Sequence, residues 1–197
     1  MVISRSGNAS YGVMIKESMK KLSFAALLAL AAPMILMASI IPQSGYSGRP
    51  GDGTCRDCHP AKQIVSTDSS RIIGLPDEWV PETVYPCTLV INYKGLNMWT
   101  FEMTTVDSNS VQAGYAVVTD PKVTTVDTLD DIVYFKNTIK GAYINKPDSA
   151  RWAFDYETPA AGTGPVTLYW CAFLKNRNND EKYFLIENCV MIPEAEE

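Results

Sequence analysis

One segment, Trp99-Thr100-Phe101-Glu102-Met103, alternates large apolar side chains with polar ones. Successive side chains of a β-strand point to opposite faces, so Trp99, Phe101 and Met103 would share one apolar face. A second segment has the same alternation, in the order Arg151-Trp152-Ala153-Phe154-Asp155-Tyr156. Strands with a single apolar face are typical of a two-layer antiparallel sandwich.

The pattern extends outward from these two segments to most of residues 85–192. Short runs rich in β-branched and aromatic residues alternate there with turn residues, and no long helical pattern interrupts them. We therefore expect an all-β, immunoglobulin-like sandwich with strands at Cys87–Tyr93, Trp99–Val106, Gln112–Val118, Ile132–Phe135, Thr138–Ile144, Arg151–Tyr156, Val166–Leu174 and Tyr183–Ile192. The side chains expected in its core are Trp99, Phe101, Trp152, Phe154, Leu168 and Trp170. Residues 193–197 form an acidic tail, expected to be solvated.

The composition excludes several other classes of protein. The chain has 197 residues, of which 46% are hydrophobic and 20% charged, and this rules out a collagen-like or wholly disordered protein. Its 17 basic and 22 acidic residues give a net charge of −5, which argues against a nucleic-acid partner.

Residues 1–41 have the pattern of an export signal. Met19-Lys20-Lys21 precedes the apolar run Leu22–Ile41, and polar, Gly-rich sequence follows. Pro33 within the run favours a cleaved signal peptide, and the alternative is an uncleaved N-terminal anchor. In either case we expect the remainder to be exported, periplasmic or extracellular, with no membrane span beyond such an anchor.

Residues 42–84 are rich in Gly, Pro, Ser and Asp, are expected to be mostly loop, and contain Cys55-Arg56-Asp57-Cys58-His59. This is the attachment pattern of c-type haem: two thiols at this spacing form thioethers with the porphyrin vinyl groups, and the next residue presents its imidazole to the iron. His59 is the only histidine of the chain. The motif therefore predicts one covalent haem c, with Cys55 and Cys58 as its thioethers and His59 as proximal iron ligand.

Three other interpretations of the motif remain open. A disulfide between Cys55 and Cys58 can form in an oxidising compartment. A thioredoxin-like redox pair would need a preceding strand and a following helix, which the Gly/Pro-rich surroundings and Pro60 disfavour. A zinc site would need further ligands, and the chain has no other histidine and no second close cysteine pair.

The remaining cysteines are Cys87, Cys171 and Cys189, all in predicted strands. In an exported protein, two of the three are expected to form a disulfide and one to remain a thiol. The sequence does not choose among the three pairings.

The stretch Gly45–His59 resembles the start of a group of exported bacterial proteins in which a single C-x-x-C-H motif precedes a reeler-like (reelin-domain-like) β-sandwich. Arg151–Pro159 and Gly162–Tyr169 are similar to the group's W-x-F-x-W-x-x-P and G-T-G-x-V motifs. Lys140–Ile144 departs from the group, which often carries a Tyr-x-x-His-Thr-like stretch there. The resemblance implies a monohaem c-type cytochrome whose haem peptide docks on the sandwich.

Two functions from different classes follow. The first is electron transfer with redox partner proteins, because no catalytic acid–base pair or nucleophile is apparent and the sole histidine would be committed to iron. On this interpretation the protein is a carrier and not an enzyme. The alternative is a binding or adhesion module in which the haem is structural or senses a gas.

With one histidine, bis-His ligation within the chain is impossible. Met98, Met103 and Met191 are the thioether candidates for the sixth iron ligand, with a Lys amine or an open site as alternatives. Met103 is the first choice, because it shares a strand face with Trp99 and Phe101. Met98, beside a turn, is the second.

Overall fold

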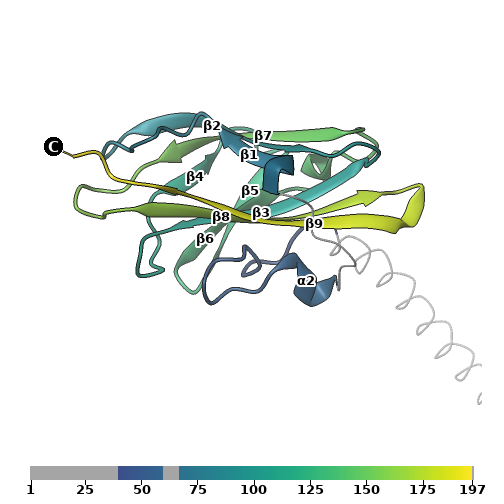
Figure 1. The fold of residues 1–197 in the computed structure, drawn as a ribbon, viewed down its shortest axis with the longest axis horizontal. Helices are drawn as coiled ribbons and strands as arrows, with labels where there is room; N and C mark the ends of the chain where they lie inside the picture. The colour runs from purple at the N-terminus through teal and green to yellow at the C-terminus, as the bar shows by residue number, and fades with distance from the viewer. Residues whose placement is uncertain (1–39, 60–66, 197) are drawn as a thin grey trace, which may run out of the picture. The chain divides into compact units, whose positions relative to one another are not determined.

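The regular secondary structure of the described chain is nearly all β, and it forms two layers. The structure is a computed structural model that describes residues 40–59 and 67–196, and it contains two antiparallel sheets (Figure 1). One sheet has the strand order β1-β2-β7-β4, and the other β5-β6-β3-β8-β9. The predicted all-β sandwich is thus confirmed.

The elements are short and mostly joined by turns. The four-stranded sheet consists of β1 (Ser70–Ile73), β2 (Val84–Asn92), β7 (Ser149–Glu157) and β4 (Tyr115–Val118). The five-stranded sheet consists of β5 (Thr124–Leu129), β6 (Ile132–Asn137), β3 (Met98–Val106), β8 (Val166–Asn176) and β9 (Asn179–Ile192). The helical elements are α2 (Cys55–Cys58) and the 3-10 turns η1 (Thr67–Ser69) and η2 (Lys140–Ala142).

The core lies between the two sheets and is rich in aromatic side chains. All six side chains predicted there are buried in it: Trp99, Phe101, Trp152, Phe154, Leu168 and Trp170. The indole N–H of Trp99 donates to the carbonyl of Lys146, and that of Trp152 to the carbonyl of Gly141, both at 2.8 Å. Burial therefore leaves neither donor unsatisfied.

One predicted strand is wrong, and two strands were missed. Thr138–Ile144 is not a strand and contains η2, where a side chain at Gly141 would collide with the carbonyl of Val123. The missed strand β5 is largely exposed and polar, so it lacks an apolar alternation, and β1 lies in the segment expected to be loop. Neither strand shows the apolar alternation on which the prediction of strands relied.

The acidic tail also differs from expectation. The carboxylate of Glu194 accepts hydrogen bonds at 2.7 Å from the backbone N–H groups of Gly162 and Gly164, at the turn before β8. Trp79 and Glu194 form an isolated bridge. The start of the tail is therefore part of the fold.

Residues 40–59, hereafter the covering segment, lie on the outer face of the five-stranded sheet (Figure 1). All nine residues of β3 are buried in consequence, although alternate side chains point away from the core. The predicted export signal, residues 1–41, lies outside the described residues except for its last two. Within the described ranges no helix is long and apolar enough to cross a membrane.

Candidate functional site

The C-x-x-C-H motif forms a single helical turn in the covering segment. Thr54 caps α2: its hydroxyl accepts from the Arg56 N–H at 3.2 Å, while the carboxylate of Asp57 accepts from the Thr54 N–H at 2.8 Å. These reciprocal bonds form a capping box, which the sequence Thr-x-x-Asp encodes locally. Cys55, Cys58 and His59 then have the i, i+3, i+4 spacing of one helix face.

Cys55 is the inner member of the motif. It is half-buried and packs against a small apolar cluster of Met98, Phe173 and Leu185 on the outer face of the sheet. Its thiol shares a hydrogen bond with the thiol of Cys171 on β8. This hydrogen bond raises the pKa of Cys55 well above its usual value, and burial is the second largest cause of the increase. Cys55 is therefore a protonated thiol at neutral pH.

His59 closes α2 and rests on the same cluster. Its ring stacks on Phe173 with 4.3 Å between centroids and 28° between planes. Burial lowers the pKa of His59, and the positive charge of Lys175 adds to the effect. The imidazole is therefore neutral at pH 7, which is the form that binds a metal.

Cys58 is the outer member of the motif and is exposed. Its thiol shares a hydrogen bond with the hydroxyl of Tyr46, and the proximity of Cys58 raises the pKa of Tyr46. Among the described residues, therefore, one thiol of the motif is exposed and its imidazole is half-buried.

The structure separates the three methionines considered as the sixth ligand. Met103 is fully buried in the main core between the sheets, on the face opposite the covering segment. Met98 lies in the cluster that Cys55 packs against, and Met191 is 65% exposed. Of these three methionines, Met98 is thus the one that packs nearest to the motif.

The expected disulfide among Cys87, Cys171 and Cys189 is a wrong prediction, because all five cysteines of the chain are free thiols. Cys87 faces the main core from β2, whereas Cys171 lies under the covering segment. Cys189 is opposite Tyr169 in the β8–β9 ladder and is exposed. Cys87 is separated from the other two thiols, because it points into the main core while Cys171 and Cys189 lie on the outer face of the five-stranded sheet.

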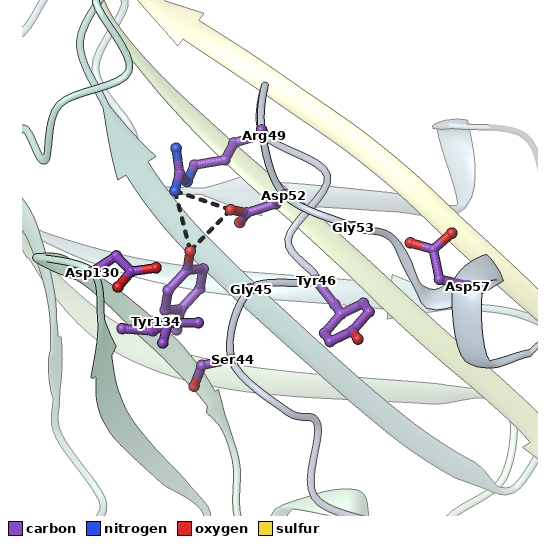
Figure 2. A pocket seen from close by; sticks show the side chains of 11 residues that line it. Ser44, Gly45, Tyr46, Arg49, Asp52, Gly53, Asp57, Asp130 and Tyr134 are labelled. Carbon is purple, nitrogen blue, oxygen red and sulfur yellow. Dashed lines mark hydrogen bonds and ion pairs between the residues drawn. The ribbon is translucent and has the colours of Figure 1, made fainter.

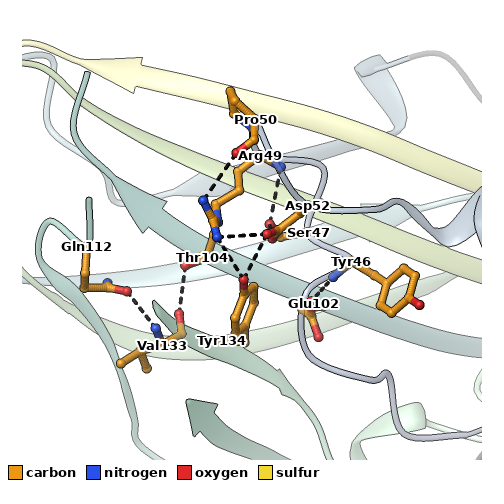
Figure 3. Close-up of polar contacts among 10 residues, drawn as sticks. All are labelled: Tyr46, Ser47, Arg49, Pro50, Asp52, Glu102, Thr104, Gln112, Val133 and Tyr134. Atoms are coloured by element: carbon orange, nitrogen blue, oxygen red, sulfur yellow. Dashed lines mark hydrogen bonds and ion pairs between the residues drawn. The ribbon is translucent and has the colours of Figure 1, made fainter. Parts of the chain in front are cut away.

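Glu102 is a functional candidate that sequence reasoning missed. It is 1% exposed, and its Oε1 accepts from the Tyr46 N–H at 2.7 Å, while Oε2 has no hydrogen-bond partner (Figure 3). Burial raises its pKa to about 7, with Asp52 adding to the effect, against the lowering influence of the Tyr46 amide and Lys136. In the sequence Glu102 belongs to the polar side of β3, which indicates a solvated face.

A second missed feature is a buried ion-pair network beneath the same segment (Figure 3). Arg49 Nη2 lies 3.0 Å from Asp52 Oδ1, and the Tyr134 hydroxyl donates to that same oxygen at 3.0 Å. Ser47, which is fully buried, donates to the other oxygen of Asp52 at 2.7 Å. The network thus ties the covering segment to β6 through Tyr134.

The network forms one wall of a polar pocket of about 480 Å³ (Figure 2). Its lining combines the covering segment with the β5–β6 turn: Ser44, Gly45, Tyr46, Arg49, Gly51, Asp52, Gly53, Asp57, Leu129, Asp130 and Tyr134. The one lining guanidinium is already paired with Asp52. The pocket therefore offers little uncompensated positive charge to an anion.

The donor set of the motif consists of the groups that covalent haem attachment would use. Among the described residues no group of three or more His, Cys, Asp and Glu side chains could hold a metal. The motif instead offers two thiols and one neutral imidazole on one helical turn, with one thiol exposed. Those are the groups that c-type haem attachment requires.

No model of a known protein family matches this chain, and no curated protein matches it. Among solved structures it is similar to the Reelin-N domain of F-spondin, at 21% identity and a TM-score of 0.47, with 65% of this chain and 86% of that chain covered. The human F-spondin reeler domain (fragment 1) is 20% identical with a TM-score of 0.45, covering 64% and 88%. A collagen-binding domain from a Staphylococcus aureus adhesin is 12% identical with a TM-score of 0.32, covering 63% and 100%. These likenesses concern the fold, and the function proposed below rests on this chain's own residues.

Proposed function

We propose that the protein is an exported monohaem c-type cytochrome that transfers electrons through one covalently attached haem. The observation that carries the proposal is the joint position of Cys55, Cys58 and His59 on one capped helical turn. A bound haem supplies reversible one-electron chemistry at its iron. Export, which the N-terminal sequence predicts, supports the proposal because haem c is attached outside the cytoplasm.

The chain's own residues would hold and orient the group. Cys55 and Cys58 would supply the thioethers, and His59 the proximal ligand. Phe173 limits rotation of the imidazole because the two rings are stacked. The neutral state of His59 keeps a nitrogen lone pair available. The capping box fixes the turn from which all three side chains project.

For the sixth ligand, packing favours Met98 over Met103. Met98 belongs to the cluster under Cys55, whereas Met103 would have to leave the main core between the sheets. Removing a fully buried methionine from a core costs about 2–5 kcal/mol, judged from the cost of truncating such side chains. Met103 nevertheless stays a prediction that only spectroscopy of the loaded protein tests.

A second candidate function is a haem-free extracellular binding module. The observation that favours it is the packing of Cys55, which contacts Cys171 and the apolar cluster and is not directed to solvent. In such a module the motif would hold the covering segment on the outer face of the five-stranded sheet.

The deciding experiment is expression of the full chain with the c-type haem maturation machinery, followed by intact mass and redox titration. The proposal predicts a mass increase of one haem, a reduced α-band, and a reversible one-electron transition. The Cys55→Ala/Cys58→Ala double variant is the control, and it should carry no covalent haem. Wild-type protein that leaves this host without haem would contradict the cytochrome and favour the binding module.

A further inference from the structure

Two cysteines that are 116 positions apart in the chain, Cys55 and Cys171, meet under α2. Cys171 lies near the middle of β8, is fully buried, and faces the covering segment. A Cβ added at Gly48 would stand 3.0 Å from its Sγ, so the backbone of the covering segment closes over this sulfur. The thiol of Cys55 is hydrogen-bonded to it from the other side.

The other three cysteines are placed differently from this pair. Cys87 is on the other sheet and points into the main core. Cys58 and Cys189 are both exposed, and Cys58 is bonded to Tyr46. A disulfide needs facing side chains at close range, and the thiols of Cys55 and Cys171 share a hydrogen bond across the contact between α2 and β8.

We propose that Cys55 and Cys171 form a reversible disulfide in the haem-free protein, which locks the covering segment to β8 and withholds Cys55 from haem attachment. Only one part of this inference, the withholding of Cys55 from haem, rests on the proposed cytochrome function. The cross-link itself would exist in either a cytochrome precursor or a binding module.

The chemistry is thiol–disulfide exchange with a disulfide oxidant, such as glutathione disulfide. One thiolate attacks the oxidant and releases a thiol, and the second thiolate then attacks the mixed disulfide. In total Cys55 and Cys171 lose two protons and two electrons, the Cys55–Cys171 bond forms, and the oxidant becomes two thiols. A thiol reductant reverses the exchange and returns Cys55 for thioether formation.

The bond would join residues that belong to different parts of the fold. It would close a loop from α2 through strands β1 to β7 into β8, so it would fix the end of the covering segment on the sheet even without haem. In the oxidised protein only Cys58 and His59 would then be available to haem. In the reduced protein the complete motif would be available. Haem attachment would thereby depend on a reducing step.

The first test is disulfide mapping of the exported full chain made without haem maturation, after equilibration with glutathione disulfide. We expect a Cys55–Cys171 peptide under non-reducing conditions and three alkylatable thiols in place of five. The Cys87→Ser variant should behave identically apart from its own missing thiol. A Cys55–Cys58 linkage, or five alkylatable thiols in the folded oxidised protein, would overturn the inference.

The second test separates the cross-link from the cytochrome function. Oxidised and reduced protein are each offered haem with the maturation machinery, and the attached haem is mapped by peptide mass. We expect two thioethers for the reduced protein and none on Cys55 for the oxidised protein. Thioethers on Cys55 in both samples would overturn the redox control while leaving the cytochrome intact. A Cys55–Cys171 peptide from protein that never takes haem would contradict the cytochrome and retain the cross-link.

Discussion

The two buried faces of the five-stranded sheet differ sharply in chemistry. Its inner face packs against the other sheet through aromatic and aliphatic side chains, and the indole donors of Trp99 and Trp152 are bonded to backbone carbonyls. Its outer face buries Glu102, Lys136 and Cys171 under the covering segment, together with the Arg49–Asp52 pair. The inner face is stable because it removes apolar area from water, whereas the outer face depends on specific partners for its polar groups.

The largest expected effect is on the inner face. Truncation of Trp152 to Ala should lower the free energy of unfolding by about 3–5 kcal/mol, because the side chain is fully buried and packs against Phe101. Urea unfolding followed by circular dichroism measures the loss. Val111→Ala, at a position that is 58% exposed, is the control and should change stability by less than about 0.5 kcal/mol. A Trp152→Ala loss below about 1 kcal/mol would contradict the described core.

The next effect concerns the outer face and depends on pH. Glu102 keeps its proton up to about pH 7 in the folded protein, against about 4.5 for an ordinary glutamate. Between these values the folded state binds more protons than the unfolded chain, so the free energy of unfolding falls as pH rises. The fall amounts to roughly 3 kcal/mol at most, at 1.36 kcal/mol per pKa unit.

Glu102→Gln should remove this fall, because the amide does not ionise while its oxygen can still accept from the Tyr46 N–H. The measurement is urea unfolding at several pH values between 4.5 and 7.5. Glu157→Gln, at an exposed position of β7, is the matched control and should retain the wild-type slope. An unchanged slope in Glu102→Gln would show that the outer face is hydrated.

The contrast between the faces also explains what the sequence could predict. The inner face follows from period-2 alternation, which places Trp99, Phe101 and Trp152 inward without knowledge of their partners. The outer face follows from the docking of an irregular segment, and its contacts join residues far apart, such as Tyr46 and Glu102. A buried glutamate on the polar side of a strand has no signature in its own neighbourhood, so the alternation alone did not reveal it.

The candidate site divides in the same way. The capping box and the helical turn of Cys55, Cys58 and His59 are local, so the motif could be read directly. The partners of the motif, Cys171 and Phe173, are more than a hundred residues further along the chain. Their strand was predictable, but which of its residues would meet α2 was not.

A smaller effect is expected where His59 rests on the sheet. Phe173→Leu removes the stacked ring while keeping an apolar side chain, and aromatic pairs contribute about 0.5–1.5 kcal/mol beyond area burial. Amide hydrogen exchange at His59, whose N–H donates to the carbonyl of Cys55, should accelerate accordingly. Tyr169→Leu, on the same face of β8, should leave exchange at His59 unchanged. Equal acceleration in both variants would mean that the ring contact is not specific.

An effect of similar size is expected at the polar end of the outer face. Tyr134→Phe deletes the hydroxyl that donates to Asp52 at 3.0 Å and accepts from Arg49 at 3.4 Å. Asp52 keeps its bonds to Arg49 and Ser47, so no charge is left unpaired, and the loss should be about 0.5–1.5 kcal/mol. Tyr115→Phe, at a position that is 48% exposed, is the control for loss of a phenol and should be neutral. The stability of both variants is measured by urea unfolding at pH 8, which is above the pKa of Glu102. A loss of more than about 3 kcal/mol from Tyr134→Phe would mean that the network unfolds as a unit, and the outer face would then be as cooperative as the core it covers.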